Sequence, residues 1–402
     1  MTTIRSMGVT LVLVTMLLSE AGPRPNVIVI LPDDQGAMDA GAYGATDLAT
    51  PAFDQLAANG VRLTQFYSAA PVCSPSRAGL LTGRYPWRVG VPSNASAPPP
   101  EAINDLAESD DKAGLLDSAV TLAEMFSAAG YRTAHIGKWH LGHGARARPR
   151  AQGFAYSFGH MGGCIDNFAH FFYWNGPNRH DLWENETRVH RPGYFFPDLI
   201  VDQTISFIRQ APDEPFFVYF ASNAPHYPYQ GDPKWIEHYA ELPFPRNIYA
   251  AFLSALDERV GRLLAFLDEA GLRDETIVVY QSDNGHSTEA RAPTLLELCD
   301  IRVPHDSLDG RSLAALLRDA DSPSPHESLH WDLGKQWAVR HGPWKLIHNV
   351  NATDGPPLAD SDRPWFLANI DEDPGELQNQ ASANPQVVAQ LRELHDAMRA
   401  VE

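Results

Sequence analysis

Short runs of β-branched and aromatic residues alternate along this chain with segments of helical pattern. The runs that we predict to be strands are 26–31, 131–136, 216–220 and 276–281. We predict helices that begin at Ala52 after Thr50 and Pro51, and others over 121–129, 198–209, about 247–270 and 385–400. This alternation favours a sheet covered by helices, and 402 residues with 44% hydrophobic composition suffice for one large domain and a smaller one.

Polar residues follow each predicted strand directly. They are Asp33-Asp34 after the first, Gly137-Lys138-Trp139-His140 after the second, Pro225-His226 after the third and Asp283-Asn284 after the fourth. In open α/β sheets ligands bind beyond the carboxyl ends of the strands, so we expect these four clusters to meet in one crevice.

The acidic clusters have two interpretations. Asp33, Asp34, Asp283 and Asn284 offer mainly oxygen ligands, which suit Ca²⁺ or Mg²⁺ and not zinc or copper. Taken singly, each pair is also typical of an ordinary turn at a strand end. Because two such pairs follow two apolar strands, a cation site is as well supported as two ordinary turns.

Cys73 opens the segment 73–84, which has Pro75 near the start of a predicted helix and Gly83 near its end. A helix N-terminus at this point would attract an anion. Two further interpretations of Cys73 stay open from the residues alone. It is either a buried structural cysteine or a thiolate nucleophile whose pKa the helix end lowers.

Three segments resemble those of the sulfatase family, the formylglycine-dependent, arylsulfatase-like branch of the alkaline-phosphatase-like superfamily. Segment 73–84 resembles the signature in which the cysteine is oxidised to formylglycine, and 130–142 is similar to the second signature. Segment 26–36 looks like the family's N-terminal metal-binding segment. The resemblance implies an α/β fold, with a large mixed sheet sandwiched by helices and a smaller C-terminal antiparallel sheet plus helix.

The resemblance also implies roles for individual residues. Asp33, Asp34, Asp283 and Asn284 would bind Ca²⁺ or Mg²⁺ together with an oxygen of the modified Cys73. Arg77 would steady the formylglycine, and Lys138, His140 and His226 would surround the sulfate. Sulfate needs cationic donors in a dry pocket, and the cation, Arg77 and Lys138 supply them.

The implied chemistry uses the two hydroxyls of a hydrated aldehyde. One hydroxyl attacks sulfur, and the other later loses its proton to expel sulfate, so no water has to attack the covalent intermediate. We expect His226 to be the acid for the leaving alcohol and His140 the base for the elimination, although the two roles are exchangeable.

The chain departs from the family's pattern after Gly285. Sulfatases usually continue with a long stretch that carries another sulfate-contacting lysine, whereas here 286–292 leads almost directly into Pro293–Cys299. No lysine lies between Lys234 and Lys335, and Arg291 is the only local replacement. We therefore expect a deletion near 287–292, which would also remove sheet and core material and open the site to water.

Beyond the break the resemblance resumes at 309–313, 336–340, 344–347 and 373–376. We accordingly predict a catalytic domain over 22–322 and a C-terminal subdomain over 323–402. Residues 1–21, with Arg5 before the apolar run 9–18 and the small residues Ser19 and Ala21, predict a signal peptide, with a buried strand or an uncleaved anchor as alternatives.

A signal peptide predicts a secreted or periplasmic protein, or one in a lysosomal-type compartment in a eukaryote. No other run is apolar enough to span a membrane. The formal charge of −19 disfavours binding to nucleic acid or anionic lipid. Three cysteines are too few for a disulfide scaffold.

The function predicted is hydrolysis of a sulfate ester, with a sulfated carbohydrate as the expected substrate and a small aryl sulfate as an alternative. A formylglycine-generating enzyme is the partner expected to modify Cys73. Aromatic side chains between 154 and 196 suit stacking on sugar rings, but we expect more of them in the core, among them Phe171, Phe172, Tyr173, Trp174 and Trp183.

Two other functions stay open. The missing lysine segment is consistent with a non-catalytic relative that binds sulfated glycans. The same superfamily also includes phosphate and phosphonate ester hydrolases, whose pockets accept a similar tetrahedral anion.

Overall fold

The structure is a computed structural model. It describes residues 24–36, 38–64, 66–95, 114–174, 178–284, 298–299, 301, 308–319, 321–350, 359–360, 362–373 and 375–400. The predicted signal peptide, the predicted deletion near 287–292 and Arg291 lie outside the described residues.

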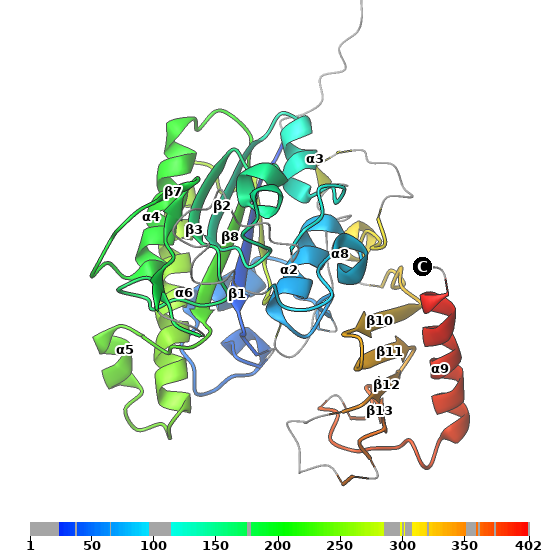
Figure 1. Cartoon of the computed structure of the whole chain (residues 1–402). Helices are drawn as coiled ribbons and strands as arrows, with labels where there is room; N and C mark the ends of the chain where they lie inside the picture. The colour runs from blue at the N-terminus through cyan, green and yellow to red at the C-terminus, as the bar shows by residue number, and fades with distance from the viewer. Residues whose placement is uncertain are drawn as a thin grey trace, which may run out of the picture.

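A seven-stranded sheet forms the centre of the larger part of the molecule, in the order β7-β6-β3-β2-β8-β1-β9 (Figure 1). Its strands are β1 (Asn26–Asp33), β2 (Arg132–Lys138), β3 (Tyr156–His160), β6 (Trp183–Glu184), β7 (Thr187–Arg188), β8 (Phe216–Pro225) and β9 (Thr276–Tyr280). The strands from β3 to β9 in this order run parallel, whereas β6 and β7 pair antiparallel. The four predicted strands and the mixed sheet are confirmed.

Helices cover both faces of this sheet (Figure 1). The helices described in this part of the chain are α1 (Pro51–Ala58), α2 (Cys73–Thr82), α3 (Leu122–Ala128), α4 (Phe196–Gln210), α5 (Pro233–His238), α6 (Arg246–Glu269) and α8 (Ala314–Arg318), and α5 packs on α6 rather than on the sheet. Short 3₁₀ turns lie at Gly41–Tyr43, Pro86–Val89, Ala145–Ala147 and Pro149–Gln152. The predicted helices therefore form, with ends shifted by one or two residues.

Alternation along the strands divides the core into two layers. Ile28 and Ile30 of β1 pack with α4 and α6, whereas Val27, Val29 and Leu31 pack with α2 and α3. Successive side chains of a strand point to opposite faces, so a strand that is apolar at every position must be covered on both sides. The uninterrupted apolar run of β1 is thus explained by its central position.

Local signals fix the helix ends near the site. Thr121 and Glu124 form a reciprocal capping box at the start of α3. Helix α2 ends at Gly83, whose φ of 65° is left-handed and suits glycine. These ends set how the chain enters β2 and leaves α2.

Strand β9 forms one edge of the sheet. Its backbone pairs only with β1 among the described residues, and the side chains of 277–280 are half-buried, whereas those of β1 are fully buried. The predicted deletion follows this strand directly in the sequence.

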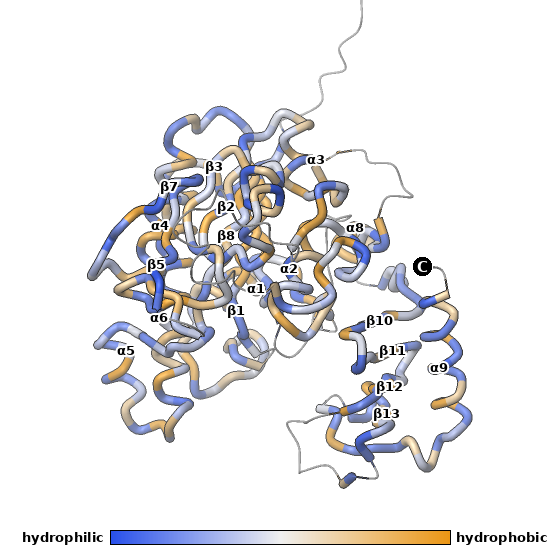
Figure 2. The backbone as a smooth tube through the Cα atoms, in the orientation of Figure 1, coloured by the Kyte–Doolittle hydropathy of each residue, from blue (hydrophilic) through white to orange (hydrophobic). Residues whose placement is uncertain are grey.

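A second sheet stands apart from the first and contains β10 (Ser328–Asp332), β11 (Trp337–His341), β12 (Trp344–His348) and β13 (Trp365–Asn369) (Figure 1). It is antiparallel, and α9 (Pro385–Arg399) packs on one face through Leu391. Figure 2 shows hydrophilic and hydrophobic stretches alternating along α9, as one apolar face requires. The smaller sheet with its helix agrees with the expected fold class. A two-stranded hairpin, β4 (Phe171–Phe172) and β5 (Arg179–His180), completes the strands.

The two sheets are joined by contacts near α2. The indole of Trp331 on β10 donates a hydrogen bond of 2.8 Å to the carbonyl of Ser68.

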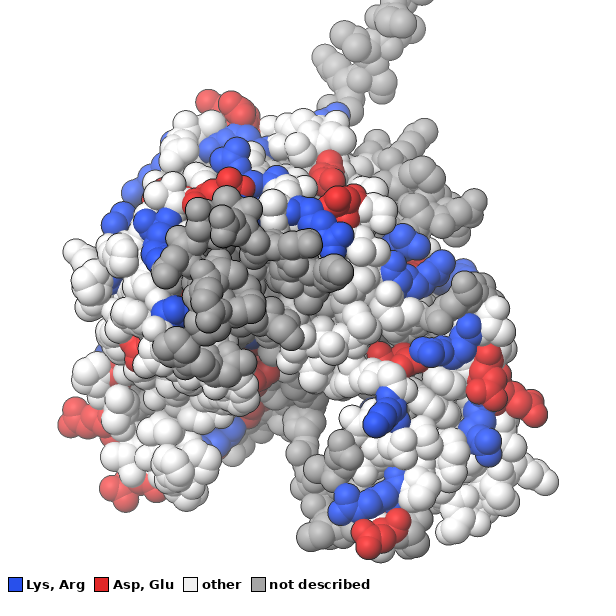
Figure 3. All heavy atoms as spheres, viewed as in Figure 1, with Lys and Arg blue, Asp and Glu red and all other residues white. Residues whose placement is uncertain are grey.

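Acidic and basic side chains are interspersed on the face shown in Figure 3. Among the described residues, no helix has the length and apolarity needed to cross a membrane.

Candidate active site

The polar clusters that follow the strands lie together at the carboxyl edge of the large sheet. Asp33 ends β1 and Lys138 ends β2, and their side chains are joined at 2.6 Å. The Asp34 amide donates to Asp283 Oδ1 at 3.2 Å, and His226 Nε2 lies 3.6 Å from Asp34 Oδ2. The structure thus brings together residues that are as much as 250 positions apart in the sequence.

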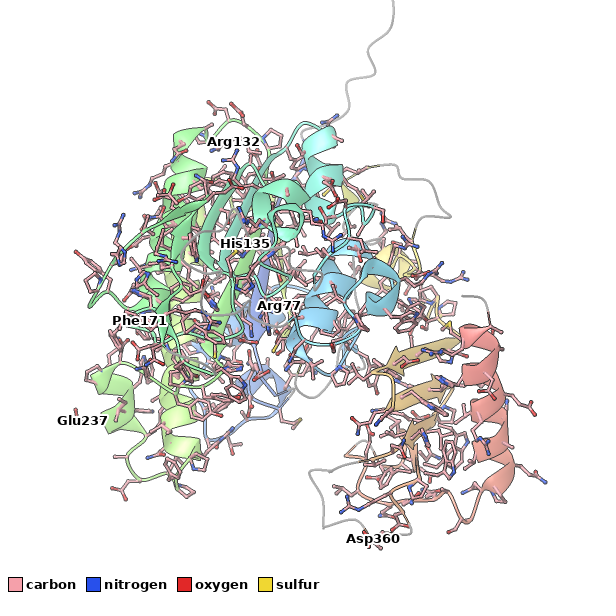
Figure 4. All side chains as sticks on the ribbon, viewed as in Figure 1. Arg77, Arg132, His135, Phe171, Glu237 and Asp360 are labelled. Atoms are coloured by element: carbon pink, nitrogen blue, oxygen red, sulfur yellow. The ribbon has the colours of Figure 1, made fainter. Side chains whose placement is uncertain are left out.

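Four fully buried charged residues, Asp33, Arg77, Lys138 and Asp283, form what we call the floor of the site. Arg77 Nε donates to Asp283 Oδ2 at 2.9 Å, and its two terminal nitrogens lie 3.3 Å from Asp33 Oδ1 and 3.0 Å from the Lys138 carbonyl. Figure 4 shows Arg77 between α2 and the sheet, while Arg132 lies at the opposite end of β2. The Arg77 guanidinium therefore ties α2 to the ends of β1 and β2 and to the segment that follows β9.

The two buried carboxyl groups of the floor have pKa values shifted in opposite directions. Burial, and then the nearby Asp283, raise the pKa of Asp33 well above its usual range, even though Lys138 and Arg77 act in the opposite direction. Burial alone would also raise the pKa of Asp283, but Arg77 and Lys138 outweigh it and lower that pKa. With Asp34, three carboxylates face two side-chain cations, so the group carries an excess of negative charge that a bound divalent cation would more than offset.

The donor set at this point fits a hard cation. Ligand atoms of Asp33, Asp34 and Cys73 lie within 4.8 Å of one another, the one group of its kind in the described part of the chain. The Asn284 side-chain amide nitrogen donates to Asp34, while its Oδ1 is buried and has no hydrogen-bond partner. A buried acceptor without a donor is costly, and a cation would satisfy it.

Cys73 is the first residue of α2 and is almost fully buried, with Sγ 4.0 Å from Asp34 Oδ1. Burial, and then Asp33, Asp283 and Asp34, raise the pKa of its thiol well above the ordinary value, against the opposite effect of Lys138. The interpretation of Cys73 as a thiolate with a lowered pKa is therefore wrong, because burial and three carboxylates outweigh the helix end.

His140 lies next to this floor and is buried. Burial, then Lys138 and Arg77, lower its pKa well below the ordinary value, and its Nδ1 has no hydrogen-bond partner. Gly163 allows the close approach, since a Cβ there would lie 2.8 Å from His140 Cε1. His140 is thus a neutral imidazole, the form that accepts a proton.

His226 is more accessible. Its Nδ1–H donates to the Tyr227 carbonyl at 2.6 Å, so the Nε2 atom faces Asp34 and the site. Burial and then Lys138 lower the pKa of His226 to about 4, while Asp34 acts in the opposite direction. A protonated His226 therefore requires a further anion in addition to Asp34, or an acidic solution.

Backbone geometry at the strand ends is unusual. Asp34 and His140 have φ of 62° and 56°, the left-handed region that residues other than glycine seldom adopt. Gly137 has φ of 122°, and a Cβ there would lie 1.8 Å from the Ala221 carbonyl oxygen. Only glycine lets β2 approach β8 this closely, which explains why it precedes Lys138.

An open cluster of aromatic rings, which we call the rim, borders the floor and consists of His226, Tyr227 and Trp174. The His226 and Tyr227 ring centroids are 4.2 Å apart, and those of Tyr227 and Trp174 are 5.6 Å apart. The expectation that the aromatics of this region belong to the core holds for Phe172 and Trp183. It is wrong for Trp174 and Phe171, which are exposed because they lie in and beside a short hairpin.

Two further residues of the site were not predicted. The Ser76 hydroxyl donates to the Asp283 carbonyl, and the buried Tyr219 of β8 lies beside Arg77, within reach of its charge. The available signal was the hydroxyl of Tyr219, because the run 216–221 is otherwise apolar. Ser76 offered none, because its partner is distant in the sequence.

Comparison with known proteins gives a consistent result. A family model described as Sulfatase matches residues 25–326. Human arylsulfatase A is 29% identical over 462 aligned positions, which cover 92% of this chain and 87% of that protein. Human N-acetylgalactosamine-6-sulfatase is 36% identical over 286 positions, covering 66% of this chain and 51% of that protein. The chain thus spans about half the length of this second relative.

A solved structure, that of Ps i-CgsB, superposes with a TM-score of 0.77 at 25% identity and covers 93% of this chain and 92% of that one. The alignment with arylsulfatase A is longer than this whole chain of 402 residues. The human protein therefore contains stretches that have no counterpart here.

Proposed function

This chain belongs to the sulfatase family, whose members are sulfuric ester hydrolases, and we propose that it cleaves sulfate esters with a formylglycine derived from Cys73 and a divalent cation. The observation that carries this proposal is the set of possible cation ligands around Cys73. Asp33, Asp34 and Cys73 converge there, beside the unpartnered Asn284 Oδ1.

The proposed cation is Ca²⁺ or Mg²⁺, held by Asp33, Asp34, Asp283, Asn284 and the modified Cys73. Bound there, it would neutralise the excess carboxylate charge and polarise the sulfate oxygens. The choice of hard cation follows from the oxygen donors, because the one sulfur in the group is the atom that the modification replaces.

Formylglycine, made by a formylglycine-generating enzyme, would supply as its hydrate the attacking hydroxyl. The role of Arg77 is to fix the position of this residue, because its guanidinium already joins Asp33, Asp283 and the Lys138 carbonyl beneath Cys73. Lys138, one residue of the same floor, would turn its ammonium toward the anionic sulfate when a cation occupies Asp33.

The two histidines would handle protons on opposite sides of the sulfate. His140 is neutral and buried, so it suits the role of base in the elimination step. His226 presents Nε2 toward the site, and an anionic sulfate ester beside it would raise its pKa and so favour the acid form. The full burial of His140 and the position of His226 Nε2 beside Asp34 support His140 as base and His226 as acid.

We propose a sulfated carbohydrate as the substrate class. The name of the human N-acetylgalactosamine-6-sulfatase refers to a sulfated sugar, and the catalytic part of this chain is similar to that protein. The proposed compartment is secreted, periplasmic or lysosomal, with 1–21 as signal peptide. The proposed domains are 22–322 and 323–402, with the deletion near 287–292 between β9 and α8.

The main competing function is that of a non-catalytic relative which binds sulfated glycans. It is favoured by the absence of lysine between Lys234 and Lys335 and by the position of β9 at the sheet edge. A site open to water beside β9 would weaken each electrostatic contact to sulfate.

The proposal is tested by comparing turnover of p-nitrophenyl sulfate with that of p-nitrophenyl phosphate, after co-expression with a formylglycine-generating enzyme. We expect faster turnover of the sulfate, loss of that turnover on removal of divalent cations, and recovery on adding Ca²⁺ or Mg²⁺. Preference for the phosphate ester would assign the chain to the phosphate hydrolases instead. Fully modified protein that cleaves neither ester would favour the non-catalytic relative.

A further inference from the structure

The rim extends outward from Asp34, one of the possible cation ligands, as a row of side chains. Asp34 is followed by His226 at 3.6 Å, then by Tyr227 at a ring separation of 4.2 Å, and then by Trp174 at 5.6 Å. Since Asp34 belongs to the group that meets at Cys73, the row begins where the sulfate of a substrate would lie. Under the proposed function, the row offers a surface on which the group attached to the sulfate would lie.

The row is held in place by a contact from the hairpin. The Tyr173 hydroxyl donates to the Tyr227 carbonyl at 2.8 Å, and the same carbonyl accepts from His226 Nδ1. One carbonyl thus positions both the catalytic histidine and the segment that carries Trp174. Tyr229 adds a further edge contact to Tyr227, with centroids 6.4 Å apart.

The exposure of these rings is unusual for their size. Trp174 is 61% exposed and Tyr227 is 37% exposed, and their ring planes are tilted by 33° with centroids 5.6 Å apart. Adjacent exposed aromatic rings next to a catalytic crevice are costly in water unless a ligand covers them. Their position indicates contact with substrate and not a contribution to the core, which Phe172 and Trp183 make.

We infer that Trp174 and Tyr227 form a one-sided stacking platform for the pyranose ring that carries the sulfate ester. This inference rests on the proposed function, since it concerns the leaving group of the same reaction. A pyranose has one face of C–H groups that suits an aromatic surface, while its hydroxyls stay hydrated on the other side. A planar aryl group would instead be best bound between two apolar walls.

Trp174 and Tyr227 should contribute differently to substrate binding and to the chemical step. Trp174 is the more exposed ring and is farther from Asp34, so it should contribute to binding and little to the chemical step. Tyr227 also supports His226 by ring contact, so its removal should affect both.

Steady-state kinetics of the full chain test this inference. The substrates are the 6-sulfates of N-acetylgalactosamine, galactose and glucose as pyranose probes, p-nitrophenyl sulfate as the aryl probe and propyl sulfate as the acyclic probe. For Trp174→Ala we expect the ratio of kcat/KM for the best pyranose probe to that for propyl sulfate to fall about tenfold, mainly through KM. Trp174→Phe should restore most of the ratio, because a ring remains.

Tyr194→Ala is the matched control, since Tyr194 is 63% exposed but makes no ring contact to the rim. It should change the ratio less than twofold. An unchanged ratio in Trp174→Ala, or an equal loss for the pyranose and aryl probes, would overturn the inference.

Failure of the inference is distinguishable from failure of the proposed function. Wild-type protein that cleaves p-nitrophenyl sulfate but neither cleaves nor binds a pyranose sulfate would overturn the platform and leave the sulfatase function standing. If no ester is cleaved, the same sugars are titrated by calorimetry. Binding that weakens about tenfold in Trp174→Ala would then support the platform, and binding that does not weaken would overturn it.

Discussion

The floor and the rim of the site lie side by side but are built in opposite ways. The floor consists of Asp33, Arg77, Lys138 and Asp283, fully buried and joined by direct ion pairs. The rim consists of rings in contact with one another, and two of them, Tyr227 and Trp174, face water. Interlocked buried charges fix one geometry, whereas an open platform tolerates different rings.

From this difference we expect the floor to serve the chemical step and the rim to serve substrate recognition. Under the proposed function, the floor would recognise what all sulfate esters share, a tetrahedral anion that needs cationic donors in a dry pocket. The rim would meet the part of the substrate that differs from one ester to another. Changes in the floor should therefore abolish turnover or folding, and changes in the rim should alter which ester is preferred.

The largest effect should come from Cys73→Ala, which removes the residue proposed to become the nucleophile above the floor. We expect kcat/KM for p-nitrophenyl sulfate to fall at least about 10⁴-fold, because the nucleophile cannot form. Cys299→Ala is the control, since Cys299 is buried away from the site near Tyr131. Residual turnover above one per cent in Cys73→Ala would break the account of the floor.

Arg77→Met should cost about 3–5 kcal/mol of unfolding free energy, because it leaves Asp33 and Asp283 buried without their shared cation. The measurement is denaturant unfolding at neutral pH. Arg88→Met removes an exposed partner of Asp309 and should cost less than about 1 kcal/mol. Equal losses in the two variants would show that the floor is not an interlocked unit.

His226→Asn, at the boundary between floor and rim, should lower kcat about 10²-fold to 10³-fold for propyl sulfate, whose leaving group needs a proton. The loss should be smaller for p-nitrophenyl sulfate, whose leaving group departs without help. The unfolding free energy should change by less than about 1 kcal/mol, because His226 belongs to none of the fully buried ion pairs of the floor. A uniform loss for both esters would remove the acid role from His226.

The smallest effect concerns pH. His160, on β3 beside Lys138, is buried with both ring nitrogens unpartnered, and burial lowers its pKa to about 3. Between its unfolded pKa near 6.5 and pH 3, the unfolded chain binds a proton that the folded chain does not, so stability falls as pH falls. From pH 7 to pH 5 the loss from His160 should be about 2 kcal/mol. His160→Phe should flatten that slope, and an unchanged slope would contradict this assignment.

Much of the floor could be predicted from the sequence, because its residues follow apolar strands whose carboxyl ends must meet in a parallel sheet. Asp33 and Lys138 end β1 and β2, and Asp283 follows β9 closely. The pairing of Arg77 with Asp283 could not be predicted, since it depends on how α2 packs across the sheet.

The rim was harder to predict for a physical reason. Phe172 and Trp174 have similar hydrophobicity and lie two positions apart, yet one is buried and the other exposed. A two-residue strand gives too short an alternation to show which face is covered, so composition favoured the core for both. Only tertiary contacts such as Tyr173 with Tyr227 decide the outcome.

The central claim is that Cys73 becomes the catalytic aldehyde of a working sulfatase. Mass spectrometry of the peptide that contains Cys73, from protein co-expressed with a formylglycine-generating enzyme, tests it most directly when turnover of p-nitrophenyl sulfate is measured on the same sample. The account predicts a residue that has lost sulfur and two hydrogens and gained one oxygen, with turnover proportional to the modified fraction. An intact thiol at Cys73 in protein that still hydrolyses the ester would contradict it.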